Sequence, residues 1–260
     1  MLVLLISQSA WADAPARVVS LKPTITDVVY ALDLGERLVG VTRYCSVPKG
    51  REKPATVADY TRPYVERIVA LSPDLVLGSQ ENSSRRSIDN LGRMGLEVKL
   101  FPFGNMEDSL ESIVKIADAL GEGERGRKLV RELRLELAKL KRTYGGKSTK
   151  RTVIVWGRRP MVVAGTGTFM DEALAYIGSE NAVRGSGVKY PKIGLEELIA
   201  LGPDIIVDLS MGSEKEDVAT RPWDRTDAIG ARVISMDMND FRAGPRLIEG
   251  LRKLGQEIHR

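Results

Sequence analysis

The sequence VERIVALSPDLVL at Val65–Leu77 returns as LEELIALGPDIIV at Leu195–Val207, displaced by half the length of the 260-residue chain. The two copies share Glu, Ala, Leu, Pro and Asp at matching places, and every other apolar position of the first copy is apolar in the second. Each copy predicts a short amphipathic helix, a Pro-Asp turn and an aliphatic β-strand. A unit of this length that recurs at half the chain predicts two similar α/β lobes with a ligand cleft between them.

Strands and helices alternate around both copies. The segment from the second strand to Tyr64 contains no strong strand pattern and is expected to be a long loop. Alternation at short spacing indicates parallel sheets covered by helices, so we expect an α/β fold with two Rossmann-like lobes. The strands expected outside the repeat are Val18–Leu21, Leu38–Val41, Val98–Phe101, Thr152–Trp156 and Arg232–Ser235.

A single long helix is expected to join the lobes. The stretch Gly121–Gly126 matches the dinucleotide-binding spacing G-x-G-x-x-G, but it follows a predicted helix, Glu107–Leu120, where that motif requires a strand. We interpret it as a break before a second helix, Glu124–Thr143, which carries leucines at helical spacing. The predicted divisions are a signal peptide (1–12), an N-terminal lobe (13–121), an inter-lobe helix (122–146) and a C-terminal lobe (147–260).

The composition argues against several classes of function. Apolar residues make up 43% and charged residues 28%, and 39 basic and 35 acidic residues give a net charge of +4 without a basic stripe, so we expect no nucleic-acid binding. The single histidine, His259, stands next to the C-terminus and is expected to be exposed, which leaves no imidazole for a catalytic triad or a zinc site. The single cysteine, Cys45, is expected to be half-buried at a strand end. We therefore predict no catalytic residues and no protein-ligated metal.

The N-terminus predicts export. An apolar run at Leu2–Ile6 precedes Ala10-Trp11-Ala12, which fits a signal peptidase site, so Asp13 would begin the mature chain. No other apolar stretch approaches the roughly 20 residues of a membrane span. Export without an anchor predicts a periplasmic protein.

Ligands of such folds bind outside the carboxyl ends of the strands, so the residues that follow the strands are the site candidates. They are aromatic and amide-rich, with one guanidinium and no acid–base pair, which suits holding a large, flat, partly apolar ligand. The candidates are Lys22-Pro23, Thr42-Arg43-Tyr44, Asp59-Tyr60, Gly78-Ser79-Gln80, Phe101-Pro102-Phe103, Met161–Thr166, Lys189-Tyr190 and Asn239–Arg242.

Three tyrosines and one arginine among them have two interpretations each. Tyr44, Tyr60 and Tyr190 either pack against their own turns or contact a ligand. Tyr60 and Tyr190 each lie shortly before a repeat helix, which predicts that they face each other across the cleft. Arg242 either pairs with Asp240 or contacts a ligand amide or phosphate.

Glu66 and Glu196 occupy equivalent positions in the first turns of the two repeat helices. The helix dipole favours acidic residues there, which is sufficient to explain them. The alternative is a pair of exposed carboxylates, one on each lobe, that dock onto basic residues of a two-fold symmetric partner.

Several segments resemble the periplasmic binding proteins for vitamin B12 and ferric siderophores, which are the substrate-capturing subunits of ABC importers. The resemblance runs from about Arg17 to the end of the chain and implies two lobes joined by one long helix, a monomer, and a dimeric membrane permease as partner. The segments that carry it are both repeat units, Arg17-Val-Val-Ser-Leu-Lys-Pro23, Leu38-Val-Gly-Val-Thr-Arg-Tyr44 and Ala243-Gly-Pro-Arg-Leu247.

The resemblance also assigns roles by position. It implies that Glu66 and Glu196 dock onto arginines of the permease. Ser79 and Val162 depart from the pattern, because the best-known B12 binder has a tryptophan and a phenylalanine at these positions. The ligand-binding residues that it implies are Pro23, Tyr44, Tyr60, Ser79, Val162, Tyr190 and Arg242.

The expected function is capture of a corrinoid (cobalamin), without chemistry and without a cofactor of the protein's own. Because the chain has no usable histidine and only one cysteine, the metal is expected to arrive already chelated. A ferric siderophore or haem is the alternative ligand. The alternative functions are a two-lobed enzyme, such as a transferase, and an adaptor that presents its ligand to a sensor.

Overall fold

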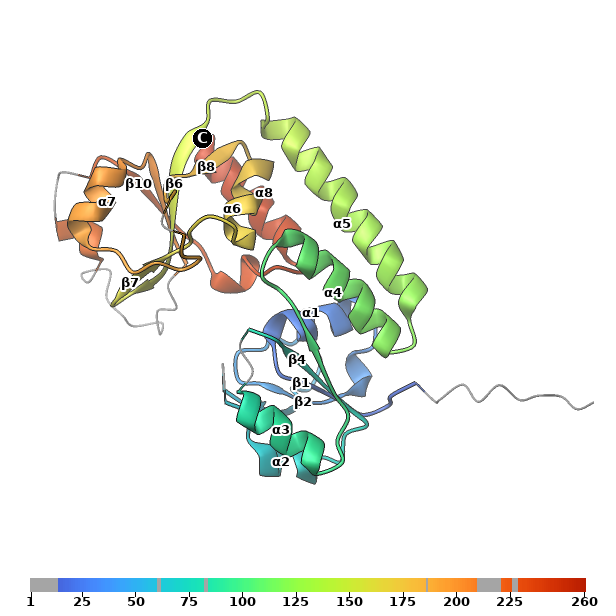
Figure 1. Cartoon of the computed structure of the whole chain (residues 1–260). Helices are drawn as coiled ribbons and strands as arrows, with labels where there is room; N and C mark the ends of the chain where they lie inside the picture. Colours follow the sequence, from blue (N-terminus) through green and yellow to red (C-terminus); the bar gives the residue numbers. More distant parts are fainter. Residues whose placement is uncertain (1–13, 60–61, 82–83, 186, 210–220, 226–228) are drawn as a thin grey trace, which may run out of the picture.

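The computed structural model describes residues 14–59, 62–81, 84–185, 187–209, 221–225 and 229–260. One sheet is built from the chain before the long helix α5 (Gly123–Tyr144) and a second sheet from the chain after it (Figure 1). The expected signal peptide lies outside the described residues. Within those residues, no helix combines the length and the apolar character that a bilayer crossing requires.

The first lobe is a five-stranded, fully parallel sheet in the order β3-β2-β1-β4-β5. The expected long loop after β2 is partly wrong, because it contains the edge strand β3, whose four residues are too few to show an alternating pattern in sequence. The strands are β1 (Val18–Ser20), β2 (Leu38–Thr42), β3 (Ala55–Ala58), β4 (Leu75–Ser79) and β5 (Val98–Phe101). The helices are α1 (Pro23–Ala31), α2 (Val65–Ala70), α3 (Arg85–Arg93) and α4 (Met106–Ala119).

The second lobe has the strand order β10-β9-β6-β7, with β8 also paired to β6. Its pairs are parallel except for the hairpin of β6 and β7. The strands are β6 (Lys150–Arg158), β7 (Met161–Val163), β8 (Ser179–Asn181), β9 (Ile205–Asp208) and β10 (Arg232–Ser235), and the helices are α6 (Phe169–Tyr176), α7 (Leu195–Leu201) and α8 (Leu247–Ile258). The predicted fold class is confirmed: an α/β protein of two lobes with mainly parallel sheets, joined by one long helix.

The sequence repeat is also a structural repeat. Asp74 of the first Pro-Asp turn accepts a hydrogen bond from the Arg17 backbone N–H over 2.7 Å, and Asp204 of the second accepts one from Arg151 over 2.7 Å. The arginine side chain then donates to a carbonyl at the end of the repeat helix, over 2.6 Å in both lobes. The same brace therefore fastens each helix–turn–strand unit to the start of the neighbouring strand.

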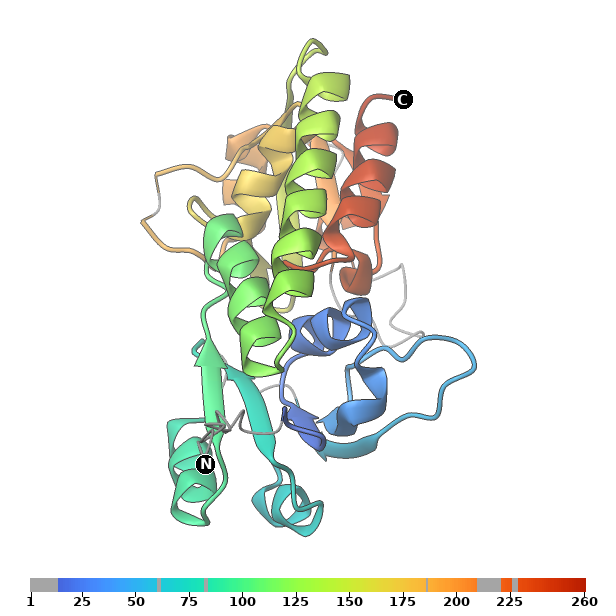
Figure 2. The ribbon, with the colours of Figure 1, turned by 90° about the vertical axis from the view of Figure 1, so that its right-hand side faces the viewer.

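Helix α5 packs against both lobes, as Figure 2 shows. It contacts α4 of the first lobe and α6 and α8 of the second, and its inward side chains Leu133, Leu137 and Leu140 are buried. The approach to α4 is close, because a Cβ on Gly126 would lie 2.3 Å from that of Ala117. The chain turns into this helix through Gly121, whose φ of 79° suits glycine, so the predicted helix break is confirmed.

The single cysteine and the single histidine both pack against other residues of the fold. Cys45 is buried, and its sulfur lies 3.0 and 3.2 Å from the hydroxyls of Thr26 and Thr42. The expected exposure of His259 is wrong: it is partly buried, its ring stacks on Tyr144 at 5.1 Å, and its Nε2 lies 2.7 Å from a backbone carbonyl oxygen. Packing of α8 against α5 brings these two rings together.

Candidate ligand-binding site

Loops at the carboxyl ends of the first sheet meet the second lobe. The carbonyl oxygen of Tyr44, after β2, accepts a hydrogen bond of 3.0 Å from Arg242, and that of Gly104, after β5, accepts one of 3.5 Å from Lys189. In Figure 1, β7 lies on the side of the second lobe that is turned toward the first. We call the following residues the inter-lobe site: Lys22, Pro23, Tyr44, Ser79, Glu81 and Phe103 of the first lobe, and Trp156, Val162, Tyr190 and Arg242 of the second.

The guanidinium of Arg242 connects the two lobes at this site. Its guanidinium donates to Asp27 of α1 over 3.2 Å, to the Tyr44 carbonyl and to Asn239. Arg242 and Asp27 are both 8% exposed, so this is a buried ion pair between the lobes. Burial raises the pKa of the Asp27 carboxyl, and the nearby charges of Arg242 and Arg246 hold that rise back.

The alternative pairing of Arg242 with Asp240 is not what the structure shows. Asp240 instead lies 3.0 Å from the ammonium of Lys253 and 3.6 Å from the guanidinium of Arg246. Arg242 and Asp240 are two residues apart at a 3-10 turn, and the arginine extends toward the first lobe. The structure therefore assigns Arg242 an inter-lobe contact, which is compatible with its predicted position at the ligand.

Ser79 and its neighbours form a hydrogen-bonded turn after the central strand β4. Ser79 is buried, and its hydroxyl donates to Glu81 over 2.5 Å. The backbone N–H of Phe103, after β5, donates to the other oxygen of Glu81 over 2.7 Å. Burial alone would raise the pKa of the Glu81 carboxyl, but these hydrogen bonds and the charge of Lys22 outweigh it and hold the pKa below its ordinary value.

Lys22 follows the central strand β1 and is influenced by the charges of Glu81 in the first lobe and Arg242 in the second. Its side chain is half-buried, and its ammonium lies 5.0 Å from the centre of the Phe103 ring. Burial lowers the pKa of this lysine, the charge of Glu81 opposes that shift, and the charge of Arg242 adds to it. The sequence placed Lys22 and Phe103 among the strand-end residues without giving them a role, and it did not single out Glu81.

The predicted aromatic residues fall into different surroundings. Tyr190 is 42% exposed, and its ring lies 6.4 Å from that of Trp156, inclined by 48°. Tyr44 is half-buried beneath the guanidinium of Arg43 at 5.6 Å. Tyr60 lies outside the described residues, so its predicted position opposite Tyr190 remains a prediction. Trp156, which the sequence reasoning missed, was visible as the only tryptophan at the end of a predicted strand.

The two remaining predicted contacts are half-buried. Pro23 is the first residue of α1, where its ring suits the helix start, and it lies three positions after the last residue of β1. Val162 lies on β7 and forms an isolated bridge with Lys192, two residues after Tyr190. That bridge holds the segment carrying Tyr190 alongside β7.

A second charged group lies at the carboxyl edge of the second sheet. Asp208, the last residue of β9, is 3% exposed and accepts a hydrogen bond of 2.6 Å from Arg158, the last residue of β6. The guanidinium of Arg221 lies 3.7 Å from the same oxygen and donates to Ser235 over 2.9 Å. An aspartate that ends the apolar strand IIVD was the available sequence signal for this group, and the sequence reasoning missed it.

Glu66 and Glu196 are both exposed, in the first turns of α2 and α7. These helices lie on different lobes, and both are distant from α5 (Figure 1).

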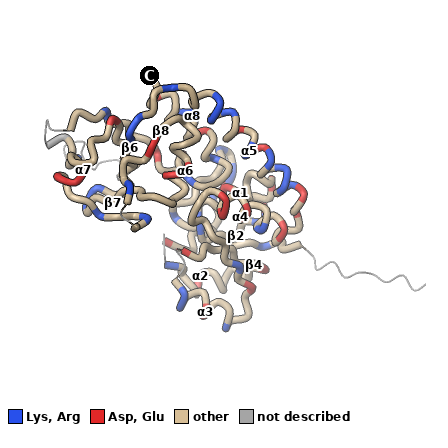
Figure 3. The backbone as a smooth tube through the Cα atoms, turned by 45° about the horizontal axis from the view of Figure 1, so that its top comes forward, with Lys and Arg blue, Asp and Glu red and all other residues tan. Residues whose placement is uncertain are grey.

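Basic and acidic residues are interspersed over the tube of the chain in Figure 3, in agreement with the absence of a basic stripe from the sequence. Within the described part of the chain, no three His, Cys, Asp or Glu residues are grouped so that they could hold a metal ion.

Sequence comparison identifies relatives along nearly the whole chain. The model of the family described as "Periplasmic binding protein" matches residues 18–234. The chain is 29% identical, over 254 residues, to the vitamin B12-binding protein of Photorhabdus laumondii; the match covers 97% of this chain and 91% of the relative.

Solved structures share the fold. The periplasmic vitamin B12-binding protein of Vibrio cholerae matches with a TM-score of 0.80 at 22% identity, covering 94% of this chain and 96% of the other. The periplasmic haem-binding protein of Roseiflexus sp. RS-1 matches with a TM-score of 0.79 at 25% identity, covering 94% and 97%. This family consists of binding proteins and not enzymes, as the sequence predicted. Because the family model matches most of the chain, the chain belongs to the periplasmic binding protein family.

Proposed function

We propose that this protein is the substrate-binding subunit of an ABC importer, and that it captures a corrinoid in the inter-lobe site. The observation that carries the proposal is the match, over 97% of the chain, to a relative that is named a vitamin B12-binding protein. The protein would work in the periplasm as a monomer and pass its ligand to a dimeric membrane permease.

The chemistry of the inter-lobe site supports this ligand class. The rings of Tyr190 and Trp156 on the second lobe and of Tyr44 on the first present flat surfaces with polar edges, which suit a large macrocycle with amide side chains. The chain has one histidine, which packs against Tyr144, and one buried cysteine. A corrinoid brings its metal already chelated, so the protein has no need to supply metal ligands.

Exposed carboxylates at equivalent positions support the permease as partner. Glu66 and Glu196 lie on structurally repeated helices, one in each lobe, and the Asp74 and Asp204 braces hold these helices in the same way. Two carboxylates held in the same way, one on each lobe, fit two symmetry-related basic patches on a dimeric permease.

Haem is the second candidate ligand, because a haem-binding protein is 25% identical and matches with a TM-score of 0.79. Calorimetric titration of the mature protein against cobalamin, haem and a ferric hydroxamate tests the choice. We expect cobalamin to bind most tightly. Tight binding of haem or the hydroxamate without cobalamin binding would overturn the corrinoid proposal, and binding of none would overturn the importer role.

A further inference from the structure

The ammonium of Lys22 has no hydrogen-bond acceptor among the described residues. It lies over the face of the Phe103 ring, 5.0 Å from the ring centre. The side chain is nevertheless half-buried, so it has lost part of its hydration. An ammonium group has three donors, and burying it without acceptors costs free energy.

The carboxylate of Glu81 does not accept a hydrogen bond from Lys22. Glu81 attracts Lys22, yet no oxygen of Glu81 comes within the 4.0 Å of an ion pair with it. The Glu81 carboxylate is held on the first lobe by the Ser79 hydroxyl and the Phe103 backbone N–H. These two bonds fix the carboxylate at its own turn, away from the lysine.

Arg242, the other cation of the site, differs from Lys22 in this respect. Its guanidinium already donates to Asp27, to the Tyr44 carbonyl and to Asn239. Lys22 follows the central strand of the first sheet, within the range at which Arg242 of the second lobe influences its charge. Of these two cations, Lys22 is therefore the one whose donors remain for a bound molecule.

We infer that Lys22 binds an ionised carboxylate at the edge of the ligand, and that it makes the site prefer a corrinoid with a free acid group over the same corrinoid with an amide in that place. The inference rests on the proposed function and specifies the ligand's periphery. A carboxylate satisfies the ammonium better than an amide oxygen does, because a hydrogen bond between two charged groups is the stronger one.

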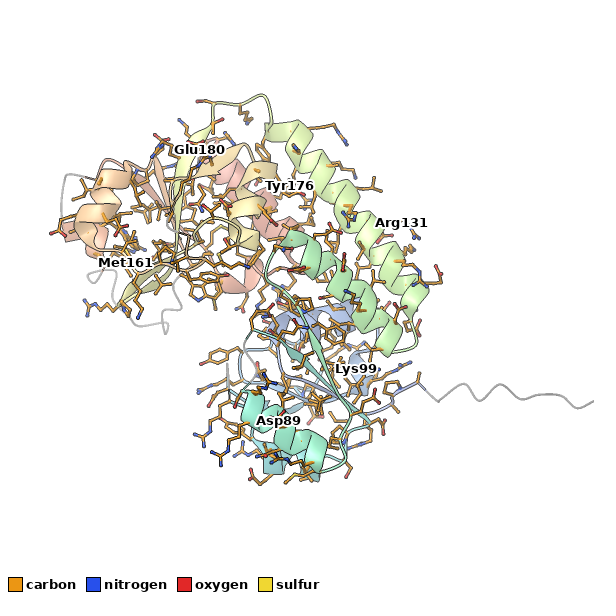
Figure 4. The ribbon with its side chains drawn as sticks, viewed as in Figure 1. Asp89, Lys99, Arg131, Met161, Tyr176 and Glu180 are labelled. Atoms are coloured by element: carbon orange, nitrogen blue, oxygen red, sulfur yellow. The ribbon has the colours of Figure 1, made fainter. Side chains whose placement is uncertain are left out.

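The test compares cobalamin with its monocarboxylates, in which one peripheral amide has been hydrolysed to an acid. Each separated isomer is titrated calorimetrically into the wild-type protein and the Lys22→Met variant, which keeps the apolar stem against Phe103. Lys99→Met is the matched control, because Lys99 lies on β5, labelled in Figure 4, and its ammonium pairs with Glu97 at 2.9 Å.

We expect at least one monocarboxylate to bind the wild type about tenfold more tightly than cobalamin, and we expect Lys22→Met to abolish this preference, whatever its own affinity for cobalamin. Lys99→Met should retain the preference. Equal affinities of the wild type for cobalamin and every monocarboxylate, or a preference that survives in Lys22→Met, would overturn the inference and leave the proposed function intact. Failure of the wild type to bind any corrinoid would overturn both.

Discussion

Arg242 of the second lobe and Asp27 of the first are 215 positions apart in the chain, yet a hydrogen bond of 3.2 Å joins them in a buried ion pair. Arg242 also holds the carbonyl of Tyr44, so one guanidinium connects the second lobe to α1 and to the loop after β2. Because both charges are buried, removal of either leaves the other unpaired, which is more costly than the loss of an exposed pair.

Arg242→Ala is therefore expected to lower the free energy of unfolding by about 3 kcal/mol. The same change should weaken ligand binding, and Arg242→Lys should not restore it, because a point charge cannot serve Asp27 and the Tyr44 carbonyl as a planar fork does. Urea unfolding and calorimetry measure the two effects. Arg246→Met is the control, since Arg246 lies 4.0 Å from the same carboxylate and is 41% exposed; it should cost under about 1 kcal/mol. Equal losses for both variants would contradict the assigned role.

Tyr190 is the exposed ring of the inter-lobe site, and its removal should affect the ligand more than the fold. We expect Tyr190→Ala to weaken cobalamin binding by about 1–3 kcal/mol, as for an aromatic anchor, with little change in thermal stability. Tyr190→Phe keeps the ring and should retain most of the affinity. We predict the same pattern for Tyr60→Ala. Unchanged affinity in Tyr190→Ala would show that this ring does not contact the ligand.

Charge reversal at Glu66 and Glu196 tests the proposed docking. The double variant to Lys should bind ligand as the wild type does, because both side chains are exposed on the repeat helices, but uptake through the permease should collapse. Each single reversal should give an intermediate loss. Glu132→Lys on the exposed face of α5 is the matched control and should transport normally. Normal transport by the double variant would leave the helix dipole as the only reason for these residues.

The Glu81 carboxyl should contribute to the fall of the free energy of unfolding at acid pH. Its pKa is lowered in the folded protein, so the stability it contributes is fully present above the ordinary value of 4.5 and is lost as the pH falls through the lower folded value. The difference in unfolding free energy between the wild type and Glu81→Gln should therefore be constant from pH 5 to 7 and shrink below about pH 4.5. Ser79→Ala, which removes one donor, should give a smaller acid-limb effect. A difference that is the same at all pH values would contradict this account.

Processing of the N-terminus tests the expected export. Mass spectrometry of the protein purified from its native host should find Asp13 as the first residue, because Ala10-Trp11-Ala12 fits a signal peptidase site. Retention of Met1 in a cytoplasmic product would remove the periplasmic assignment.

Local patterns in the sequence were sufficient for the architecture. The repeat at Val65–Leu77 and Leu195–Val207 predicted two lobes because apolar period and turn residues are local properties. The strands β3, β7 and β8 escaped prediction, because three or four residues carry little periodicity and their pairing partners come from elsewhere in the chain.

The candidate site was less predictable than the fold. Positions after the strands could be named, since parallel strands bring their carboxyl ends to one edge. The partner of Arg242 could not, because Asp27 lies on the first helix of the chain and only the assembled lobes bring the two together. The hydrogen bonds that fix Glu81, and the lysine that they leave without an acceptor, likewise depend on two loops meeting in space.

Under the proposed docking, helix α5 helps to set the distance between Glu66 and Glu196. Its 22 residues span about 33 Å, and the same brace fixes Glu66 and Glu196 within their respective lobes. One added turn would lengthen α5 by about 5.4 Å and would shift the buried leucines that pack it against the two lobes. Under the proposed docking, the packing of α5 against both lobes therefore sets the distance between the two docking carboxylates, and a permease must present its basic patches at that distance.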